Sequence, residues 1–302
     1  MRCQGQLAAA AERGDFGAAA TQVWGGPNIA HPVYAALYGR PTTLGAWLFA
    51  AAVRCCFLCL ATKPGRWLAR RCAARLGAKG FAFARTAGLF RALDVDGFEA
   101  SALDAASYLP LFLARILFDP RLRVFAHANL QPDNARFTMG DAKYEVLVAP
   151  FDWGGAGFGP LPLLLGGTFS GIPHETYDRH EDQFFIAYCD ELCAGSGRRL
   201  DNNELRDLFR ACDGAISALV AAYYVGTDVV DARPGIDWAG VEHVLHPQVQ
   251  AHWNTRCWVT NLHERAWAHT ERRPRTPGLD AAKALAEREA VAVLGAWARV
   301  LF

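Results

Sequence analysis

The sequence predicts an α+β fold that is mainly helical and contains one small β-hairpin near its middle. Several stretches carry apolar residues at helical spacing, and two short apolar segments flank turn residues at 139–142. Hydrophobic residues make up 52% of the 302 residues and charged residues 20%, a composition that excludes wholesale disorder. The chain is long enough for one large domain or two modest domains.

Net charge and cysteine content limit the kinds of function that the sequence supports. The formal net charge of +1 gives no whole-chain argument for binding nucleic acid or an anionic membrane. The nine cysteines form no paired framework, which indicates reduced thiols and a cytoplasmic protein. Cys55, Cys56 and Cys59 lack a second pair of metal ligands, so we expect buried core thiols there rather than a metal site.

The first part of the chain carries few strong signals of secondary structure. Residues 1–20 have neither the long apolar stretch nor the cleavage site of a signal peptide. Glycine and proline at 25–28 and 39–41 predict an irregular or weakly helical region before residue 43. Residues 44–61 approach membrane-spanning length, but Arg54 at their centre would cost about 2.5–3.5 kcal/mol on insertion. We expect a buried core helix there, with a membrane anchor as the alternative.

A basic helix is expected at residues 63–79. Its arginines recur at helical spacing, at Arg66, Arg70, Arg71 and Arg75. A solvated face is the expected role of these side chains, and a patch for phosphate or lipid headgroups is the alternative. Residues 94–97 predict a turn, and residues 107–118 predict an apolar helix ended by an Asp-Pro pair.

The hairpin is the centre of the functional prediction. A short strand at 122–126 is followed by a polar loop and then by hairpin strands at 135–138 and 144–151. Asn134 lies just before the first hairpin strand and Asp152 just after the second. Because a hairpin folds the chain back on itself, we expect the two side chains to lie near one another. Carboxylate and amide oxygens are ligands that Mg²⁺ accepts together with substrate phosphates, so a metal–phosphate site is predicted.

These residues also resemble a known family. His127-x-Asn129-x4-Asn134, followed by Phe151-Asp152-Trp153, resembles the motif of kinase-like phosphotransferases of the aminoglycoside phosphotransferase and ecdysteroid-kinase-like (CHK) group. The resemblance implies a protein-kinase-like fold, represented mainly by the helical C-lobe with its catalytic-loop hairpin. It also implies that Asn134 and Asp152 hold Mg²⁺ with ATP, that Asn129 positions the acceptor hydroxyl, and that His127 braces the loop.

Departures from the family pattern predict impaired catalysis. Asn129 stands where the family has an aspartate that accepts the proton of the substrate hydroxyl, and an amide has no useful basicity. General-base assistance is worth ~10²–10⁴-fold in rate. Ala128 replaces a glycine, and a further family acid expected after Gly159 falls in the leucines at 163–165. The segment before His127 lacks a glycine-rich loop and a strand lysine, so the N-lobe is expected to be truncated or degenerate.

The remainder is expected to be helical. The glycine-rich residues 154–160 are interpreted as a flexible equivalent of an activation segment. Residues 180–193 predict an amphipathic helix. Asp201 and Glu204 form a capping-box-like start for a long helix that Gly226 is expected to end.

This interpretation divides the chain into three segments and leaves two alternative functions. We expect a helical or irregular N-terminal region at 1–84, a kinase-like C-lobe at 85–270, and a linker with a final helix at 271–302. The expected function is ATP-dependent phosphorylation of a small hydroxylated or amino-alcohol molecule, with catalysis impaired at Asn129. The alternative is a non-catalytic pseudokinase that binds a ligand or a partner protein. Nucleic acid is not expected as a partner, and a membrane only through residues 44–61.

Overall fold

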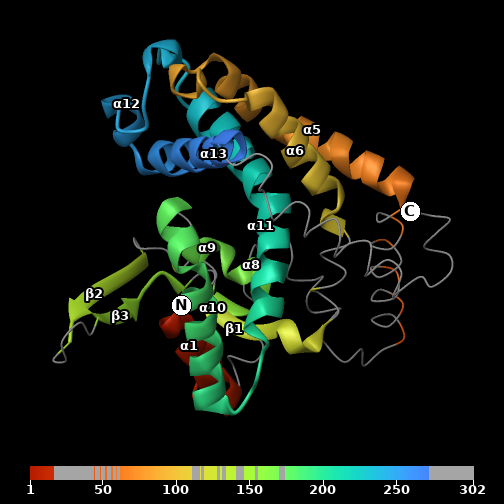
Figure 1. The fold of residues 1–302 in the computed structure, drawn as a ribbon, viewed down its shortest axis with the longest axis vertical. Coiled ribbons are helices and arrows are strands. Elements are labelled where there is room, and N and C mark those ends of the chain that lie inside the picture. The colour runs from red at the N-terminus through yellow and green to blue at the C-terminus, as the bar shows by residue number, and fades with distance from the viewer. Residues whose placement is uncertain are drawn as a thin grey trace. The chain divides into compact units, whose positions relative to one another are not determined.

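The structure is a computed structural model that describes residues 1–16, 62–110, 119–127, 134–140, 146–153, 156–169 and 174–271, with isolated positions between them. Over these residues the chain is α+β and mostly helical, with two two-stranded antiparallel sheets (Figure 1). Two compact units are present. Unit 1 combines Met1–Cys55 with Ala114–Phe209, and unit 2 combines Cys56–Leu113 with Arg210–Phe302. The division into 1–84, 85–270 and 271–302 stays a prediction.

Unit 1 contains both sheets and the helices next to them in sequence. In chain order its elements are α1 (Arg2–Arg13), η3 (Pro120–Leu122), β1 (Arg123–His127), β2 (Ala135–Met139), β3 (Val146–Pro150), β4 (Ala156–Pro160), α8 (Leu161–Leu164), α9 (Gly166–Phe169), α10 (His174–Ser196) and the start of α11 (Asn202–Tyr224). The predicted helix at 180–193 is confirmed within α10.

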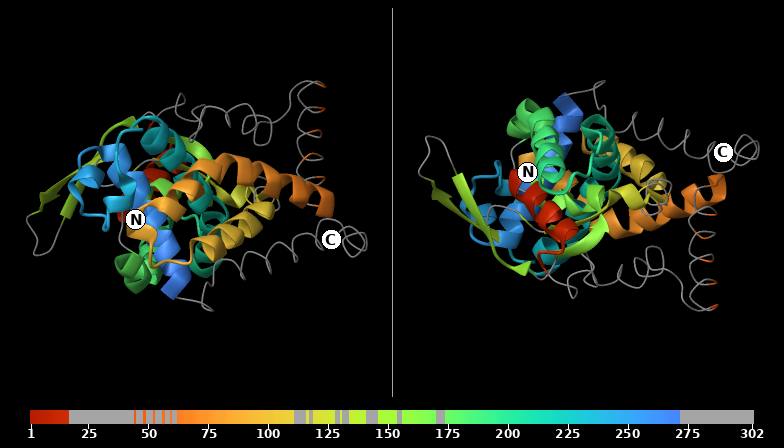
Figure 2. Two further views of the ribbon diagram at one scale, coloured as in Figure 1. Left: turned by 90° about the horizontal axis from the view of Figure 1, so that it is seen from above. Right: turned by 90° about the horizontal axis from the view of Figure 1, so that it is seen from below.

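The N-terminal helix α1 is an integral part of unit 1. Figures 1 and 2 show it lying alongside α10, and its buried Ala8 and Ala9 belong to the same apolar cluster as Tyr188 and Leu192 of α10. The helices approach closely because α1 has small residues there: a Cβ on Gly5 would lie only 2.6 Å from the Tyr188 carbonyl oxygen. Within the region predicted as irregular or weakly helical, residues Arg2–Arg13 thus form a packed helix, and contacts with α10 add to what a short isolated helix could supply.

The glycine-rich segment after Asp152 forms a strand. β4 pairs antiparallel with β1, with Val124 opposite Gly159 and His127 opposite Ala156. The interpretation of 154–160 as a flexible segment was therefore wrong for residues 156–160. The error has a physical cause: glycine disfavours strands in isolation, whereas pairing with the buried strand β1 supplies backbone hydrogen bonds that no local pattern reports.

The predicted hairpin is confirmed. β2 and β3 pair antiparallel, with Ala135 opposite Pro150 and Met139 opposite Val146. Its first strand ends within one residue of the predicted boundary, and its second strand is shorter than predicted, over the residues that the structure describes. The short strand before it is also confirmed, one residue further along the chain than predicted.

Unit 2 is helical in the residues described. In order its elements are α5 (Lys63–Thr86), η2 (Gly88–Phe90), α6 (Val95–Ser107), the end of α11, the π-helical segment η6 (Val225–Asp231), η7 (Trp238–Gly240), α12 (Pro247–Gln250) and α13 (Trp253–Glu271). The basic helix is thus confirmed and extends beyond Lys79. The predicted turn at 94–97 is instead a helix start, because the Asp94 side chain caps α6 by accepting a hydrogen bond from the Gly97 N–H.

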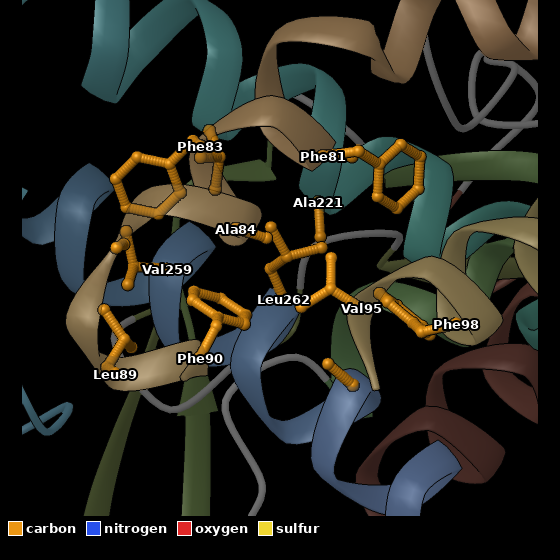
Figure 3. Close-up of a cluster of buried hydrophobic side chains, with 14 of the residues drawn as sticks. Phe81, Phe83, Ala84, Leu89, Phe90, Val95, Phe98, Ala221, Val259 and Leu262 are labelled. Carbon is orange, nitrogen blue, oxygen red and sulfur yellow. The ribbon is translucent and has the colours of Figure 1, made fainter. Parts of the chain in front are cut away.

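An aromatic core holds unit 2 together. Figure 3 shows Phe81 and Phe83 from α5 meeting Phe90, Phe98 and Leu262 in one buried cluster. The Phe81 and Phe98 rings meet edge to face with centroids 5.9 Å apart, and the Phe83 and Phe90 rings do so at 6.1 Å. Such pairs add to the burial of apolar area, so this cluster is a main source of stability in the unit.

The long helix α11 begins as predicted and ends later. The Asp201 carboxylate accepts the Glu204 N–H at 2.8 Å, which confirms the helix cap. Gly226 does not end the helical path, because it continues as η6, where Gly226 lies against Lys79 of α5. Residues 202–231 are long and apolar enough to cross a membrane by length and composition, a test that the core helices of soluble proteins also pass.

Part of the predicted core helix at 44–61 is described and is exposed. The described positions are helical and recur every three or four residues, at Leu44, Leu48, Ala52, Cys56 and Cys59. The expectation of buried thiols was therefore wrong for Cys56 and Cys59. Cys55 and most of this stretch, most of 107–118 and all of the final helix at 280–301 lie outside the described residues.

Alkylation should distinguish two exposed cysteines, Cys56 and Cys72, from two buried ones, Cys189 and Cys212. Cys56 and Cys72 are exposed, whereas Cys189 and Cys212 are buried; burial raises the pKa of Cys189 to about 11 and also raises the pKa of Cys212. Because the thiolate is the nucleophile, only ~0.1% of Cys189 is reactive at about pH 8. Iodoacetamide should label the exposed pair first in native protein and all four in urea, as read by peptide mass spectrometry. Equal native rates for Cys72 and Cys212 would contradict this packing.

Candidate functional site

The predicted structural histidine lies at the end of β1 and is fully buried. The Nε2 atom of His127 lies 2.8 Å from the carbonyl oxygen of Phe151, at the end of the hairpin. A carbonyl only accepts hydrogen bonds, so Nε2 carries the proton. The Nδ1 atom is buried without a hydrogen-bond partner among the described residues, and the Trp153 ring lies against the imidazole with centroids 5.0 Å apart. His127 therefore connects strand β1 to the residue before Asp152.

A glutamine that the sequence interpretation missed holds the backbone of His127. The Gln4 side chain on α1 accepts the His127 N–H at 3.1 Å and donates to the His127 carbonyl at 2.8 Å. The same amide nitrogen donates to the Thr168 hydroxyl of α9 at 2.8 Å, and Gln4 is fully buried. The sequence signal was slight: a polar residue on the otherwise alanine-rich face of α1. Gln4 and His127 are 123 positions apart, so only the fold brings them together.

The hairpin brings the backbones of the two predicted metal ligands to the same end; the closeness of their side chains stays a prediction. The Phe151 N–H donates to the carbonyl of Asn134 at 3.0 Å, which extends the β2–β3 pairing by one residue. Asn134 is largely buried, whereas Asp152 is exposed. Phe151 is therefore held on both sides, by Asn134 through its N–H and by His127 through its carbonyl. The next residue in the chain is Asp152.

The backbone at Asp152 has an uncommon conformation. Its φ is +55°, and it is the one residue other than glycine with a positive φ in the part of the chain that the structure describes. Asp and Asn tolerate this left-handed region better than most residues, and such conformations cluster at functional sites. The Asp152 carboxylate makes no hydrogen bond or ion pair with any described residue. Its charge is thus directed by a constrained backbone and is available for a ligand.

The donor set fits a metal only in part. Asn129, the predicted positioning residue, lies outside the described residues, as do Ala128 and Asp133. Within the described ranges no group of three or more His, Cys, Asp or Glu side chains could hold a metal ion. The candidate oxygen ligands among the described residues are the exposed Asp152 carboxylate and the Asn134 side-chain amide. Mg²⁺ commonly binds one or two protein carboxylates and completes its coordination with phosphates and water, so these residues fit a metal that arrives with a nucleotide.

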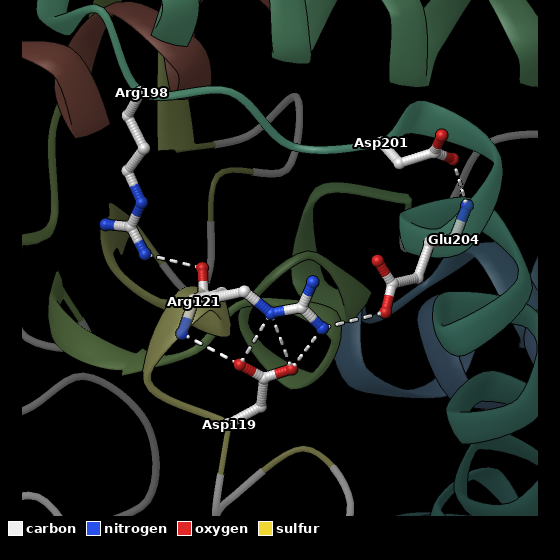
Figure 4. A network of polar contacts seen from close by, with 5 residues as sticks. All are labelled: Asp119, Arg121, Arg198, Asp201 and Glu204. Atoms are coloured by element: carbon white, nitrogen blue, oxygen red, sulfur yellow. Dashed lines mark hydrogen bonds and ion pairs between the residues drawn. The ribbon is translucent and has the colours of Figure 1, made fainter.

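An ion-pair network holds the start of β1. Figure 4 shows Arg121 between the carboxylates of Asp119 and Glu204; its Nη2 atom lies 2.7 Å from Asp119 and 3.1 Å from Glu204. Hydrogen bonding to Asp119 raises the pKa of Arg121 further above its ordinary value. Arg198 donates to the Arg121 carbonyl and pairs with Glu12 of α1. The network links η3, α1 and the loop before α11, so both ends of β1 are tied to α1.

The hairpin also exposes an apolar face. Phe137 lies opposite Val148 and Met139 opposite Val146, so these side chains share one face of the two-stranded sheet. Phe137 is 55% exposed, Met139 69% and Val146 50%. An isolated hairpin is only marginally stable, and an exposed face of this kind is typical of a surface that binds something.

No protein-family model, no curated protein and no solved structure matches the chain. The resemblance to kinase-like phosphotransferases therefore rests on the residues between His127 and Trp153 themselves.

Proposed function

We propose that the hairpin end in unit 1 binds a magnesium–nucleotide complex and that the protein is a kinase-like, ATP-dependent small-molecule phosphotransferase with impaired catalysis. The acceptor would be a hydroxylated or amino-alcohol molecule, and the compartment would be the cytoplasm. Asn134 and Asp152 would hold the metal, His127 would brace the loop, and Asn129 would orient the acceptor hydroxyl.

One observation carries this proposal: Phe151 is fixed on both sides, and the exposed carboxylate that follows it sits on a left-handed backbone. The His127 imidazole holds the Phe151 carbonyl at 2.8 Å and Asn134 holds its N–H at 3.0 Å. The positive φ of Asp152 costs free energy, of order 1–3 kcal/mol where such conformations are sparsely populated. A purely structural turn could use glycine at this position, so an aspartate there supports a role for its charge.

The metal and the protein side chains would have different chemical roles. When bound, Mg²⁺ neutralises charge on the phosphates and positions them. The chain supplies an anionic oxygen at Asp152, an amide oxygen at Asn134, and an immobile imidazole at His127 that carries its proton on Nε2. Asn129 can donate or accept a hydrogen bond but cannot remove a proton, so the acceptor hydroxyl would keep its proton until late in the transfer. A slow reaction is the expected consequence.

The second candidate function is a pseudokinase that works as a binding scaffold. The exposed apolar face of the hairpin favours it, because Phe137, Met139 and Val146 would remain in water if the protein acted alone. Asn129 fits this function as well, since a scaffold needs no general base. The two functions share a nucleotide site but differ in turnover.

Nucleotide binding should appear as a thermal shift that requires both magnesium and Asp152. At a MgATP concentration of about 100 times Kd, linkage stabilises the protein by about 2.7 kcal/mol, a shift of several degrees. Asp152→Asn keeps a residue that tolerates a left-handed backbone but removes the charge, and it should abolish the magnesium-dependent shift. The matched control is Asp190→Asn on α10, which removes an exposed carboxylate elsewhere in unit 1. Equal shifts in wild type and Asp152→Asn would refute the proposed metal ligand.

Measuring phosphoryl transfer or ATP hydrolysis then distinguishes a phosphotransferase from a binding scaffold. Restoring the carboxylate with Asn129→Asp should raise phosphoryl transfer or ATP hydrolysis by ~10²–10⁴-fold if the site is a phosphotransferase lacking its base. MgATP binding in both proteins with turnover in neither would favour the scaffold. Absence of any MgATP-dependent shift in either protein would overturn the nucleotide site itself.

A further inference from the structure

The solvent-facing side of α5 concentrates positive charge. The helix contains seven basic residues and no aspartate or glutamate between Lys63 and Thr86. Towards its C-terminal end the cations are neutralised by other helices: Lys79 pairs with Asp231 at 2.6 Å and Arg85 with Asp96 at 2.8 Å.

The N-terminal half of α5 differs. Arg70 lies 3.8 Å from Asp104, but Lys63, Arg71 and Arg75 are exposed and form no ion pair with any residue in the described part of the chain. Arg71 and Arg75 are four residues apart, a spacing at which like charges destabilise a helix. A face of the solvated type usually interleaves acids with such cations, and this one does not. The alternative of an anion-binding patch therefore gains support over a solvated face.

Large apolar side chains share this surface. Trp67 is 57% exposed and Leu68 48%, and the Arg71 guanidinium stacks 4.4 Å from the centroid of the Trp67 ring. At 100° per residue, Trp67, Arg71, Arg75 and Leu68 fall within an arc of about 100°, which we call the α5 face. Lys63 lies about 40° outside this arc, and the half-exposed Leu76 lies about 80° beyond Leu68 and outside the face. Two apolar side chains thus flank two arginines on one side of a single helix.

We propose that the α5 face docks the protein on an anionic membrane surface. A helix lying in the headgroup region buries tryptophan and leucine at the acyl boundary while arginine and lysine contact lipid phosphates. The chemistry of the α5 face matches that arrangement in both respects. Its cations, which no described residue neutralises, would also find the counter-charge that α5 itself lacks. This inference is independent of the proposed nucleotide site, which lies in the other unit.

A phosphate backbone alone explains the α5 face less well. Nucleic acid would satisfy Arg71 and Arg75, but it offers no apolar layer for Leu68. The apolar residues therefore decide between the two anionic partners. Substituting these apolar residues therefore distinguishes membrane binding from nucleic-acid binding in an experiment.

The test is flotation of the full chain with vesicles of phosphatidylcholine alone or with about 30% phosphatidylserine. The protein should partition onto the anionic vesicles, and salt should weaken the binding. Each cation near such a surface contributes about fivefold to the partition coefficient, so Arg71→Gln with Arg75→Gln should lower it about 25-fold. Trp67→Ser with Leu68→Ser should lower it at least tenfold and remove the binding that survives high salt.

Control variants distinguish binding through the α5 face from a general effect of charge and from loss of folding. Arg91→Gln with Arg233→Gln removes the same charge elsewhere in unit 2 and should leave partitioning within about twofold of wild type. Arg71→Lys with Arg75→Lys keeps the charge and should retain most of the binding. Equal partitioning onto neutral and anionic vesicles, or equal losses in the two Gln pairs, would overturn the proposal. So would tight binding of a short single-stranded RNA that depends on Arg71 and Arg75 but not on Trp67 and Leu68.

Discussion

Replacing Gln4 with leucine should destabilise the protein by about 2–4 kcal/mol and should weaken the response to MgATP. The substitution leaves the buried N–H of His127 without its acceptor and removes the hydrogen bonds to the His127 carbonyl and to Thr168. A buried donor left unsatisfied costs about 1–3 kcal/mol, and each lost hydrogen bond adds about 1 kcal/mol. The His127 carbonyl retains one donor, the Leu130 N–H at 3.1 Å, which limits the loss.

The matched control lies two residues away on the same helix. Gln6 is exposed, and its amide donates to Glu191 at 3.1 Å, so Gln6→Leu should change stability by no more than about 0.5 kcal/mol. Urea unfolding measures both free energies, and hydrogen exchange at the backbone N–H of His127 reports where the loss occurs. If the two leucine variants unfold at the same urea concentration, α1 does not hold β1 in the way the hydrogen bonds indicate.

Replacing Gly80 with valine should destabilise unit 2 by about 3 kcal/mol or more. A Cβ at this position on α5 would lie 2.0 Å from the carbonyl oxygen of Ala222 and 2.6 Å from its Cα. Both atoms belong to the backbone of α11, so no side chain can rotate away and the two helices must separate. Overpacking a core by a methylene or more typically costs 1–3 kcal/mol, and a contact with rigid backbone lies at or above the upper end of that range.

Ala78→Val on the exposed side of α5 is the appropriate comparison. It makes the same small-to-branched change in the same helix and should cost only about 0.5 kcal/mol, through helix propensity. Thermal and urea unfolding of both variants, followed by circular dichroism, measure the difference. A Gly80→Val variant as stable as Ala78→Val would show that α5 and α11 do not approach this closely in solution.

The parts of the fold that could be predicted are those specified by local signals. The hairpin followed from turn residues between two apolar runs, and the start of α11 from the spacing of Asp201 and Glu204. The basic helix followed from arginines at helical spacing. In each case the information lies within about ten consecutive residues, and the backbone hydrogen bonds that form are also local.

The elements that the sequence interpretation missed depend on contacts between distant segments rather than on local signals. β4 exists because the glycine-rich segment pairs with β1, some thirty residues earlier in the chain. Helix α1 is packed because Gly5, Ala8 and Ala9 fit against α10, although alone it would be a weak helix. Helical structure continues past Gly226 because the glycine accommodates the neighbouring helix α5. Contacts between distant segments decided these three elements, and no local pattern carries that information.

The sequence by itself determined that Asn134 and Asp152 flank a hairpin. Side-chain type and short spacing suffice for that. Only the tertiary structure decided how Asp152 is presented. His127 and Asn134 hold Phe151 from two sides, Gln4 holds His127 from a helix 123 positions away, and the next residue, Asp152, has a left-handed backbone. The physical reason is that backbone conformation at a loop depends on hydrogen bonds from distant segments, which exist only after the chain has folded.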